Sequence, residues 1–80
     1  MERTELLKFI KQAIANETGE SVDSIDETQT FQSMGLDSLN SIVVLNEIED
    51  KYKISLNSLS FWDYPTLGAF TDFLLKEHIS

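Results

Sequence analysis

The stretch Gly35-Leu36-Asp37-Ser38-Leu39 is the part of the sequence around which the rest of the chain is arranged. A serine stands between an aspartate and a leucine, and a strong helical pattern starts directly after it. Serine and aspartate are preferred N-cap residues, so Ser38 is expected at or beside a helix N-terminus. Backbone N–H groups there lack intrahelical acceptors and the helix dipole favours negative charge, so a phosphate ester on Ser38 would be stabilised. The same residues also fit an ordinary helix start, and the five residues alone do not decide between the two interpretations.

The residues after this stretch predict an amphipathic helix from Ser38 to Tyr52. At roughly 100° per residue, we expect an inward face, with Val44 at its margin, made of Ile42, Leu45, Ile48 and Tyr52. The outer face is predicted to carry Leu39, Asn40, Val43, Glu47 and Asp50. Leu39 and Val43 are spaced four apart and form a small apolar stripe beside Ser38. A stripe of this kind, rimmed by polar residues, favours a partner-docking surface over incidental exposure.

An earlier segment, from Thr4 to Glu17, also predicts an amphipathic helix, because its apolar residues recur at spacings of three and four. Thr4 is a suitable N-cap, and Gly19 is well placed as the C-terminal stop. Residues 20–36 then form a long connection rich in turn-forming residues. We expect the connection to be pinned to the core by its apolar residues, Val22, Ile25, Phe31, Met34 and Leu36.

The last part of the chain predicts one short and one longer helix. Residues 58–62 suggest a single helical turn, which Pro65 ends because the residue before a proline is steered away from helix. The longer helix is expected to start near Thr66 as its N-cap. Gly68 weakens that helix and is expected to let another helix approach closely.

Together these segments predict an all-α fold in a single domain spanning residues 1–80. The expected architecture is a small four-helix bundle, with three longer helices, one short helix and a long loop between helices 1 and 2. Phe61 is expected in the core. Trp62 is either a core residue or an interface anchor, since large aromatics serve in both roles.

Composition limits the classes of function that the chain can have. Fourteen acidic residues against six basic ones give a formal net charge of -8, which disfavours nucleic acid and anionic membranes as partners. The charge suits basic patches on partner proteins, although solubility alone explains it equally well. There are no cysteines, which excludes disulfides, thiolate metal sites and a cysteine nucleophile. Residues 1–5 lack the features of a signal peptide, and no apolar run approaches a membrane span, so we expect a cytoplasmic protein.

The sequence offers no catalytic or metal-binding constellation. A serine nucleophile needs an adjacent base, and the one histidine, His78, lies far from Ser38 in sequence, near the end of a helix. The Gly-x-Ser-x-Gly elbow is absent. Asp23, Asp26 and Glu27 lack the central glycine and terminal glutamate of a calcium loop, so they are interpreted as solvated acids. We therefore expect no enzyme activity and no metal site.

Three segments together resemble the acyl and peptidyl carrier protein family. Residues 35–39 resemble its G-x-D-S-L signature, and Phe31-Gln32-Ser33-Met34 resembles the F-x-x-(L/M) lead-in. Tyr64-Pro65-Thr66-Leu67 resembles the (H/Y)-P-T-(L/I) element that opens the last helix of polyketide and nonribosomal carriers. The resemblance covers roughly residues 5–76. It implies that Ser38 carries a 4′-phosphopantetheine arm, attached from coenzyme A by a Mg²⁺-dependent phosphopantetheinyl transferase that also contacts Asp37 and Leu39.

The resemblance also implies the role of the arm and the enzymes that act on its cargo. Acyl- or aminoacyl-loading enzymes and condensing or processing enzymes would act on a thioester carried by the arm's thiol. Leu36 stands where fatty-acid carriers have alanine, and Asn40 and Val43 stand where they have acidic residues. We therefore expect a discrete, monomeric carrier of secondary metabolism, most similar to polyketide carriers. The start at Met1 also leads us to expect a free-standing protein.

The sequence leaves three hypotheses about the function. The first is the acyl carrier, with a peptidyl carrier of a nonribosomal or hybrid pathway as its near alternative. The second is an unmodified helical adaptor that binds partners through the Leu39 and Val43 surface. The third is a small hydrolase built on Ser38.

Overall fold

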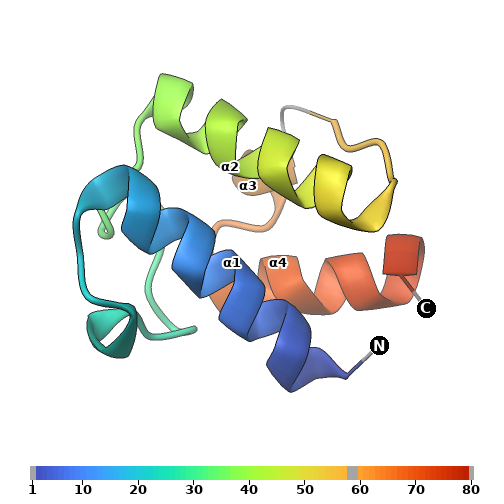
Figure 1. Ribbon diagram of the computed structural model, residues 1–80, viewed down its shortest axis with the longest axis horizontal. Coiled ribbons are helices and arrows are strands. Elements are labelled where there is room, and N and C mark those ends of the chain that lie inside the picture. The colour runs from blue at the N-terminus through green and yellow to red at the C-terminus, as the bar shows by residue number, and fades with distance from the viewer. Residues whose placement is uncertain (1, 58–59, 80) are drawn as a thin grey trace.

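The computed structural model describes residues 2–57 and 60–79, and this part of the chain is built from helices and loops (Figure 1). The helices in chain order are α1 (Arg3–Thr18), the 3-10 helix η1 (Val22–Ser24), α2 (Ser38–Tyr52), α3 (Ser60–Asp63), α4 (Leu67–Leu74) and the π-helical η2 (Leu75–Ile79). The described residues contain no strand, only an isolated bridge between Thr30 and Thr66. The predicted class is confirmed: all-α, with three longer α-helices and one short one.

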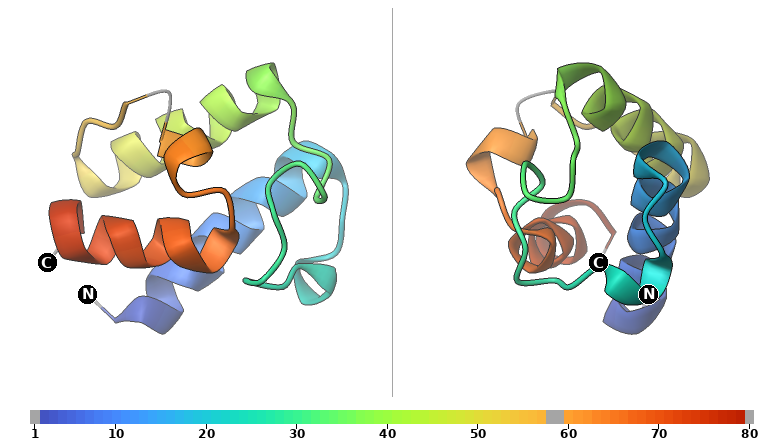
Figure 2. Two further views of the ribbon diagram at one scale, coloured as in Figure 1. Left: turned by 180° about the vertical axis from the view of Figure 1, so that it is seen from behind. Right: turned by 90° about the vertical axis from the view of Figure 1, so that its left-hand side faces the viewer.

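Helix α1 crosses the other two long helices and contacts both α2 and α4. Figure 2 shows α3 on the side of the molecule away from α1, between α2 and α4. The start of α1 and the end of η2 lie at one end of the longest dimension, which is 29 Å, and the start of α2 lies at the other end (Figures 1 and 2). None of the described helices is both long enough and apolar enough to cross a membrane.

The core forms where these helices meet, and its largest fully buried side chains come from α1, α2 and α4. They are Phe70, Leu6, Ile10, Ile14, Ile48, Leu67, Leu74, Val44 and Thr71. Burial of apolar area on this scale is the main force that favours the folded state. The Thr71 hydroxyl is satisfied inside the core, because it donates to the Leu67 carbonyl at 2.8 Å.

The long connection between α1 and α2 is held against this core, as predicted. Ile25, Phe31, Met34 and Leu36 are buried, and Val22 packs on the cluster while half-exposed. The Phe31 ring lies 4.2 Å from that of Phe61 and 5.7 Å from that of Phe70, between ring centroids. The loop is therefore a fixed part of the structure.

Backbone hydrogen bonds join this loop to the start of α4. Phe31 N donates to Pro65 O at 3.0 Å, and Gly68 N donates to Glu27 O at 2.8 Å. A Cβ added at Gly68 would lie 3.2 Å from that same Glu27 carbonyl oxygen. Gly68 does permit a close approach: the nearest backbone belongs to the loop, and helix α1 comes near only through the Arg3 side chain, whose Nη2 would lie 3.5 Å from that Cβ.

The inward face of α2 differs from the prediction. Ile42 was expected inside and is 44% exposed, whereas Val44 was placed at the margin and is fully buried. Leu45 and Ile48 are buried and Tyr52 is half-buried, so the buried face is rotated toward Val44. Apolar residues from 42 to 48 cover more than half of the helix circumference, and the positions of α1 and α4 decide which of them are buried.

Helix boundaries agree with the sequence in most places. Gly19 ends α1 in the left-handed region with φ 80°, and the Thr66 hydroxyl caps α4 by accepting from Ala69 N at 3.2 Å. The Thr4 cap is wrong, because α1 already begins at Arg3 after Glu2, which makes no side-chain capping bond. The predicted short helix is found at Ser60–Asp63, and the expectation for residues 58 and 59 lies outside the described residues.

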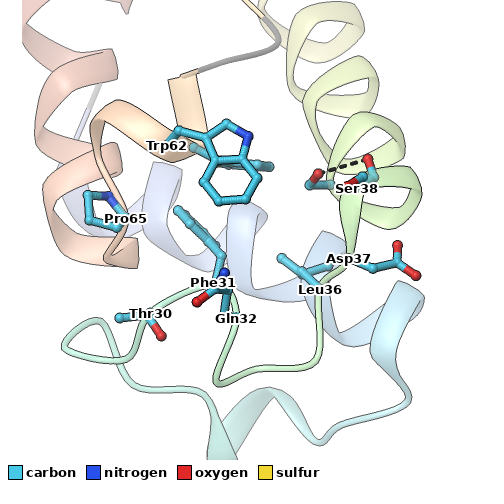
Figure 3. A pocket seen from close by; sticks show the side chains of 10 residues that line it. Thr30, Phe31, Gln32, Leu36, Asp37, Ser38, Trp62 and Pro65 are labelled. Atoms are coloured by element: carbon cyan, nitrogen blue, oxygen red, sulfur yellow. Dashed lines mark hydrogen bonds between the residues drawn. The ribbon is translucent and has the colours of Figure 1, made fainter.

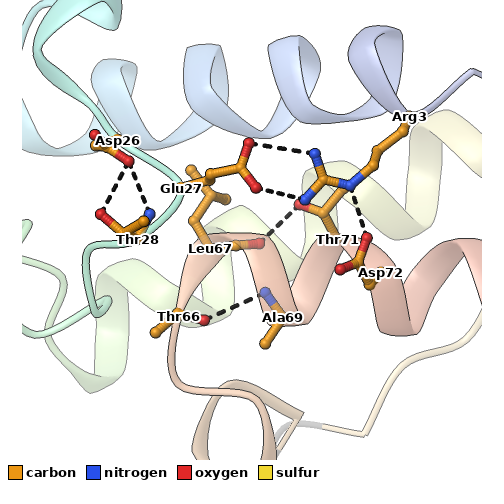
Figure 4. A network of polar contacts seen from close by, with 9 residues as sticks. All are labelled: Arg3, Asp26, Glu27, Thr28, Thr66, Leu67, Ala69, Thr71 and Asp72. Atoms are coloured by element: carbon orange, nitrogen blue, oxygen red, sulfur yellow. Dashed lines mark hydrogen bonds and ion pairs between the residues drawn. The ribbon is translucent and has the colours of Figure 1, made fainter.

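An ionic cluster that was not predicted lies at the start of α1 (Figure 4). The Arg3 guanidinium lies 2.6 Å from the Glu27 carboxylate, measured Nη2 to Oε1, and 2.7 Å from that of Asp72, measured Nε to Oδ1. The hydrogen bond from Arg3 lowers the pKa of Glu27, and both acids raise the pKa of Arg3. The cluster links α1, the loop and α4.

We predict that Val44→Ala and Ile42→Ala differ sharply in their effect on the free energy of unfolding. Val44→Ala removes fully buried methyl groups and should lower it by about 2–3 kcal/mol. Ile42→Ala changes a partly exposed side chain and should lower it by less than about 1 kcal/mol. Urea denaturation followed by circular dichroism measures both values. Equal losses in the two variants would contradict the observed orientation of α2.

We also predict a pH-dependent loss of stability for Arg3→Gln. The folded pKa of Glu27 lies below its ordinary value of 4.5, so its stabilising effect is present above pH 4.5 and disappears as the pH falls through the folded pKa. Arg3→Gln should therefore lower the melting temperature by a few degrees at pH 7, and the difference should vanish in strong acid. Lys8→Gln removes a charge from the exposed face of the same helix and is the matched control. A constant difference from pH 7 into acid would exclude the ionic explanation.

Candidate functional site

Ser38 is the first residue of α2, and its side chain is exposed. Asp37 is the N-cap: its carboxylate accepts from Asn40 N at 2.8 Å, and its carbonyl accepts from Ser41 N at 3.0 Å. Helix geometry leaves the N–H groups of Ser38 and Leu39 without intrahelical acceptors. The Ser38 hydroxyl therefore stands beside the positive end of the helix dipole, at the position that the sequence predicted.

The turn before α2 explains why the serine faces outward. Gly35 has φ 87°, in the left-handed region that glycine adopts without strain. Met34 N and Leu36 N both donate to Phe31 O, at 3.2 Å each, which closes the loop tightly. Leu36 is thereby directed into the protein, where it is 7% exposed, and the next two residues are exposed.

A cavity of about 290 Å³ opens beside Ser38 (Figure 3). The lining side chains come from the loop before α2, the first turn of α2, α3 and the segment before α4. They are Thr30, Phe31, Gln32, Leu36, Asp37, Ser38, Ser41, Phe61, Trp62 and Pro65. Figure 3 shows Ser38 and Trp62 on opposite sides of the cavity, with Leu36 and Phe31 below them in this view and the Asp37 carboxylate directed away.

Trp62 is the exposed aromatic of the site. It is 63% exposed, whereas its neighbour Phe61 is 7% exposed and packs on Phe70 with ring centroids 4.6 Å apart. Phe61 is a core residue, as expected. Trp62 was predicted to be either a core residue or an interface anchor. Its exposed indole excludes the first of these two roles.

The outer face of α2 continues from the site. Leu39 is 74% exposed and Val43 is 40% exposed, which confirms that the apolar stripe beside Ser38 is on the surface. Exposed Ile42 widens the stripe, although it was predicted on the inward face. Of the polar residues predicted around it, Asn40 and Glu47 are half-buried and Asp50 is exposed. Spacings of three, four and seven residues place these side chains on neighbouring lines of one helix.

Asp37 is the one carboxylate among the described residues that line the cavity, and Figure 3 shows it directed away from the space beside Ser38. The described lining residues include no histidine, lysine or cysteine that could take the hydroxyl proton. His78 lies in η2, at the opposite end of the molecule, where it packs edge-on against Phe73 with ring centroids 5.2 Å apart. Within the part of the chain that the structure describes, no three metal-ligating side chains come together. What the structure shows at this position is an exposed serine hydroxyl at the first turn of α2.

The same arrangement fits a phosphate ester attached to Ser38. The hydroxyl is exposed, N–H groups of the helix start lie beside it, and the cavity offers apolar wall and polar rim next to it. The walls formed by Leu36 and Pro65 were not predicted as site residues, although both stand in the segments that resemble the carrier family. Their place beside Ser38 depends on the Phe31 carbonyl turn and on the pairing of Phe31 with Pro65.

Comparison with known proteins gives the site a family. The family model described as "Phosphopantetheine attachment site" matches residues 8–74. The non-reducing polyketide synthase aptA of Emericella nidulans is 38% identical over 63 residues, which are 79% of this chain and 4% of the synthase. The conidial pigment polyketide synthase PfmaE of Pestalotiopsis fici is 31% identical over 84% of this chain and 3% of the synthase. The chain thus spans a small part of these curated relatives.

Solved structures agree in fold. A free-standing peptidyl carrier protein from an uncharacterised secondary metabolic pathway of Acinetobacter baumannii is 33% identical, with TM-score 0.88 and 95% of both chains covered. The HMG-ACPI domain from the CurA module of Lyngbya majuscula is 27% identical, with TM-score 0.84, covering 94% of this chain and 76% of that domain.

We predict that Asp37 has a measurable structural role as a cap. Asp37→Ala should lower the free energy of unfolding by about 1 kcal/mol, because the Asn40 N–H loses its acceptor. Asp37→Asn keeps an oxygen acceptor and should retain most of the stability. Urea denaturation of the three proteins measures this difference. Equal destabilisation by both substitutions would show that the carboxylate charge, rather than the cap bond, stabilises α2.

Proposed function

This chain belongs to the phosphopantetheine-attachment family of carrier domains, and we propose that it is a discrete acyl carrier protein of polyketide or related secondary-metabolite biosynthesis. In this proposal Ser38 bears a 4′-phosphopantetheine arm, and acyl intermediates are carried on it as thioesters. The observation that supports it most directly is the exposed Ser38 hydroxyl at the first turn of α2, within the matched region.

Each residue of the site has a proposed role. Ser38 supplies the hydroxyl that a phosphopantetheinyl transferase joins to the arm, with coenzyme A and Mg²⁺ as co-reactants. Asp37 holds the helix start in place, and the N–H groups there stabilise the phosphodiester charge. When bound, the arm supplies a thiol, which this cysteine-free chain lacks. The chain itself is proposed to be non-catalytic and to act as a substrate of its partner enzymes.

Partner enzymes form the second part of the proposal. Carrier domains of polyketide synthases work with loading and condensing enzymes, and we extend that to this chain and its transferase. The exposed apolar stripe on α2 lies next to the attachment point, so an enzyme docked there would have the arm within reach. The proposed contacts are Leu39, Asn40, Val43, Glu47, Asp50 and Trp62. The formal net charge of -8 favours partners with basic surfaces.

The proposal also covers the domain organisation, the oligomeric state and the cellular location of the protein. We place residues 1–80 in a single carrier domain, since one connected core includes side chains from α1, the loop, α2, α3 and α4. We propose a monomer that works in trans, and the match to a free-standing carrier over 95% of both chains supports the second part of this statement. A cytoplasmic location follows from the use of coenzyme A as donor of the arm.

A peptidyl carrier is the second candidate function. It is favoured by the 33% identity and the TM-score of 0.88 to a free-standing peptidyl carrier protein. The acyl carrier is favoured by the polyketide synthases that match most of this chain. The two candidates share the arm and the attachment site and differ in cargo, so loading assays with acyl and aminoacyl donors distinguish them.

We predict that the protein gains the mass of one phosphopantetheine group when it is incubated with coenzyme A, Mg²⁺ and a broad-specificity transferase. Intact-protein mass spectrometry measures the gain. Ser38→Ala should abolish it, because the accepting hydroxyl is removed. Ser41→Ala is the matched control, since Ser41 lies one turn later in α2 and lines the same cavity, and this variant should be modified like the wild type.

An unchanged mass would overturn the carrier proposal. The unmodified helical adaptor would then be favoured, and its partner binding should survive Ser38→Ala and be lost in Val43→Asp. Turnover of an activated ester that disappears in Ser38→Ala would instead indicate the hydrolase reading.

A further inference from the structure

Aromatic rings of the core form the inner side of the cavity beside Ser38. Phe31 and Phe61 line it, are 5% and 7% exposed, and pack together with ring centroids 4.2 Å apart. Phe70, which is fully buried, lies against both rings at 5.7 and 4.6 Å between centroids. A group entering from Ser38 therefore meets packed core, and going deeper would require these rings to separate.

The size of the cavity limits its occupant to a short group. Its volume is about 290 Å³. It lies at the lower end of the range of ligand pockets, which is about 300–1,000 Å³. This space suits one part of a flexible arm and is too small for a long acyl chain in addition.

The lining has the chemistry of an amphipathic tether. Leu36, Trp62 and Pro65 give apolar walls, and Gln32 and Ser41 contribute an amide and a hydroxyl. Phosphopantetheine offers groups of the same kinds: a methylene joins its phosphate to a carbon with two methyl groups, which is followed by a hydroxyl and an amide. An indole that is 63% exposed opposite the attachment point is an amphipathic surface suited to such a group (Figure 3).

We infer that this cavity holds the phosphate-proximal half of the arm against Trp62, so that the thiol and its cargo stay outside the helical core. The inference rests on the proposed function, since it needs an arm on Ser38. It deepens that function by assigning Trp62 as a positioning residue for the arm. The attachment point on the cavity wall, the closed inner side and the limited volume all support it.

Tryptophan fluorescence tests the inference directly, because Trp62 is the single tryptophan of the chain. The unmodified and modified proteins, identified by intact mass, are compared in emission maximum and in quenching by acrylamide. We expect a blue shift and an at least about twofold smaller quenching constant after modification, because the indole loses contact with water. Ser38→Asp places charge at the helix start without an arm, and it should behave like the unmodified protein.

A second measurement follows the arm itself. The chain has no cysteine, so a maleimide dye on the modified protein labels only the thiol of the arm. Dye anisotropy should fall in Trp62→Ala, since one wall of the cavity is lost, and should be unchanged in Ile42→Ala, which removes a different exposed apolar side chain. Tryptophan emission of the wild type should also be the same for short and long acyl cargoes.

The outcomes separate the inference from the function on which it rests. A normal mass gain with unchanged emission and unchanged anisotropy in Trp62→Ala would overturn the inference and leave the carrier function standing. An emission maximum that shifts progressively with acyl length would show that cargo enters the cavity, which also overturns it. Failure to gain mass would remove both proposals together.

Discussion

Contact among Phe31, Phe61 and Phe70 holds together a loop, a very short helix and a longer helix. Phe31 belongs to the loop, Phe61 to the four-residue helix α3, and Phe70 to α4. A helix as short as α3 has almost no stability of its own, so its position depends on such packing. Because these rings also form the inner side of the cavity, the same contact that stabilises the fold shapes the surface next to Ser38.

Local signals made the elements of this fold predictable. Gly19 and Thr66 are capping residues whose effect is confined to one turn, and both act as the sequence indicates. The apolar residues of the loop were also identified correctly, since a buried loop needs such anchors. Orientation was harder: α2 carries apolar residues around much of its circumference, and burial of Val44 in place of Ile42 is decided by helices distant in sequence. The Arg3 cluster with Glu27 and Asp72 depends on the same long-range arrangement, which no local pattern records.

The candidate site likewise has one part that local sequence predicts and one part that depends on long-range packing. Placement of Ser38 at a helix start follows from residues 35–39, because capping preferences and the glycine turn are local. The cavity does not follow from them, since its walls come from the loop, α2, α3 and the residues before α4. Trp62 and Leu36 face Ser38 only after the loop has paired with Pro65 and Gly68. A motif can thus identify an attachment point while the surface around it depends on tertiary packing.

The placement of the two ends of the described chain bears on how such a unit works inside a larger assembly. The start of α1 and the end of η2 lie together, at the far end of the longest dimension from the start of α2 (Figures 1 and 2). A polypeptide linker joined to either end would leave the helical body on the side away from Ser38. Neighbouring domains would then crowd the rear of the unit, and the half-space in front of the serine would stay open to visiting enzymes. Anything fused to the two ends would therefore leave the surface around the serine uncovered.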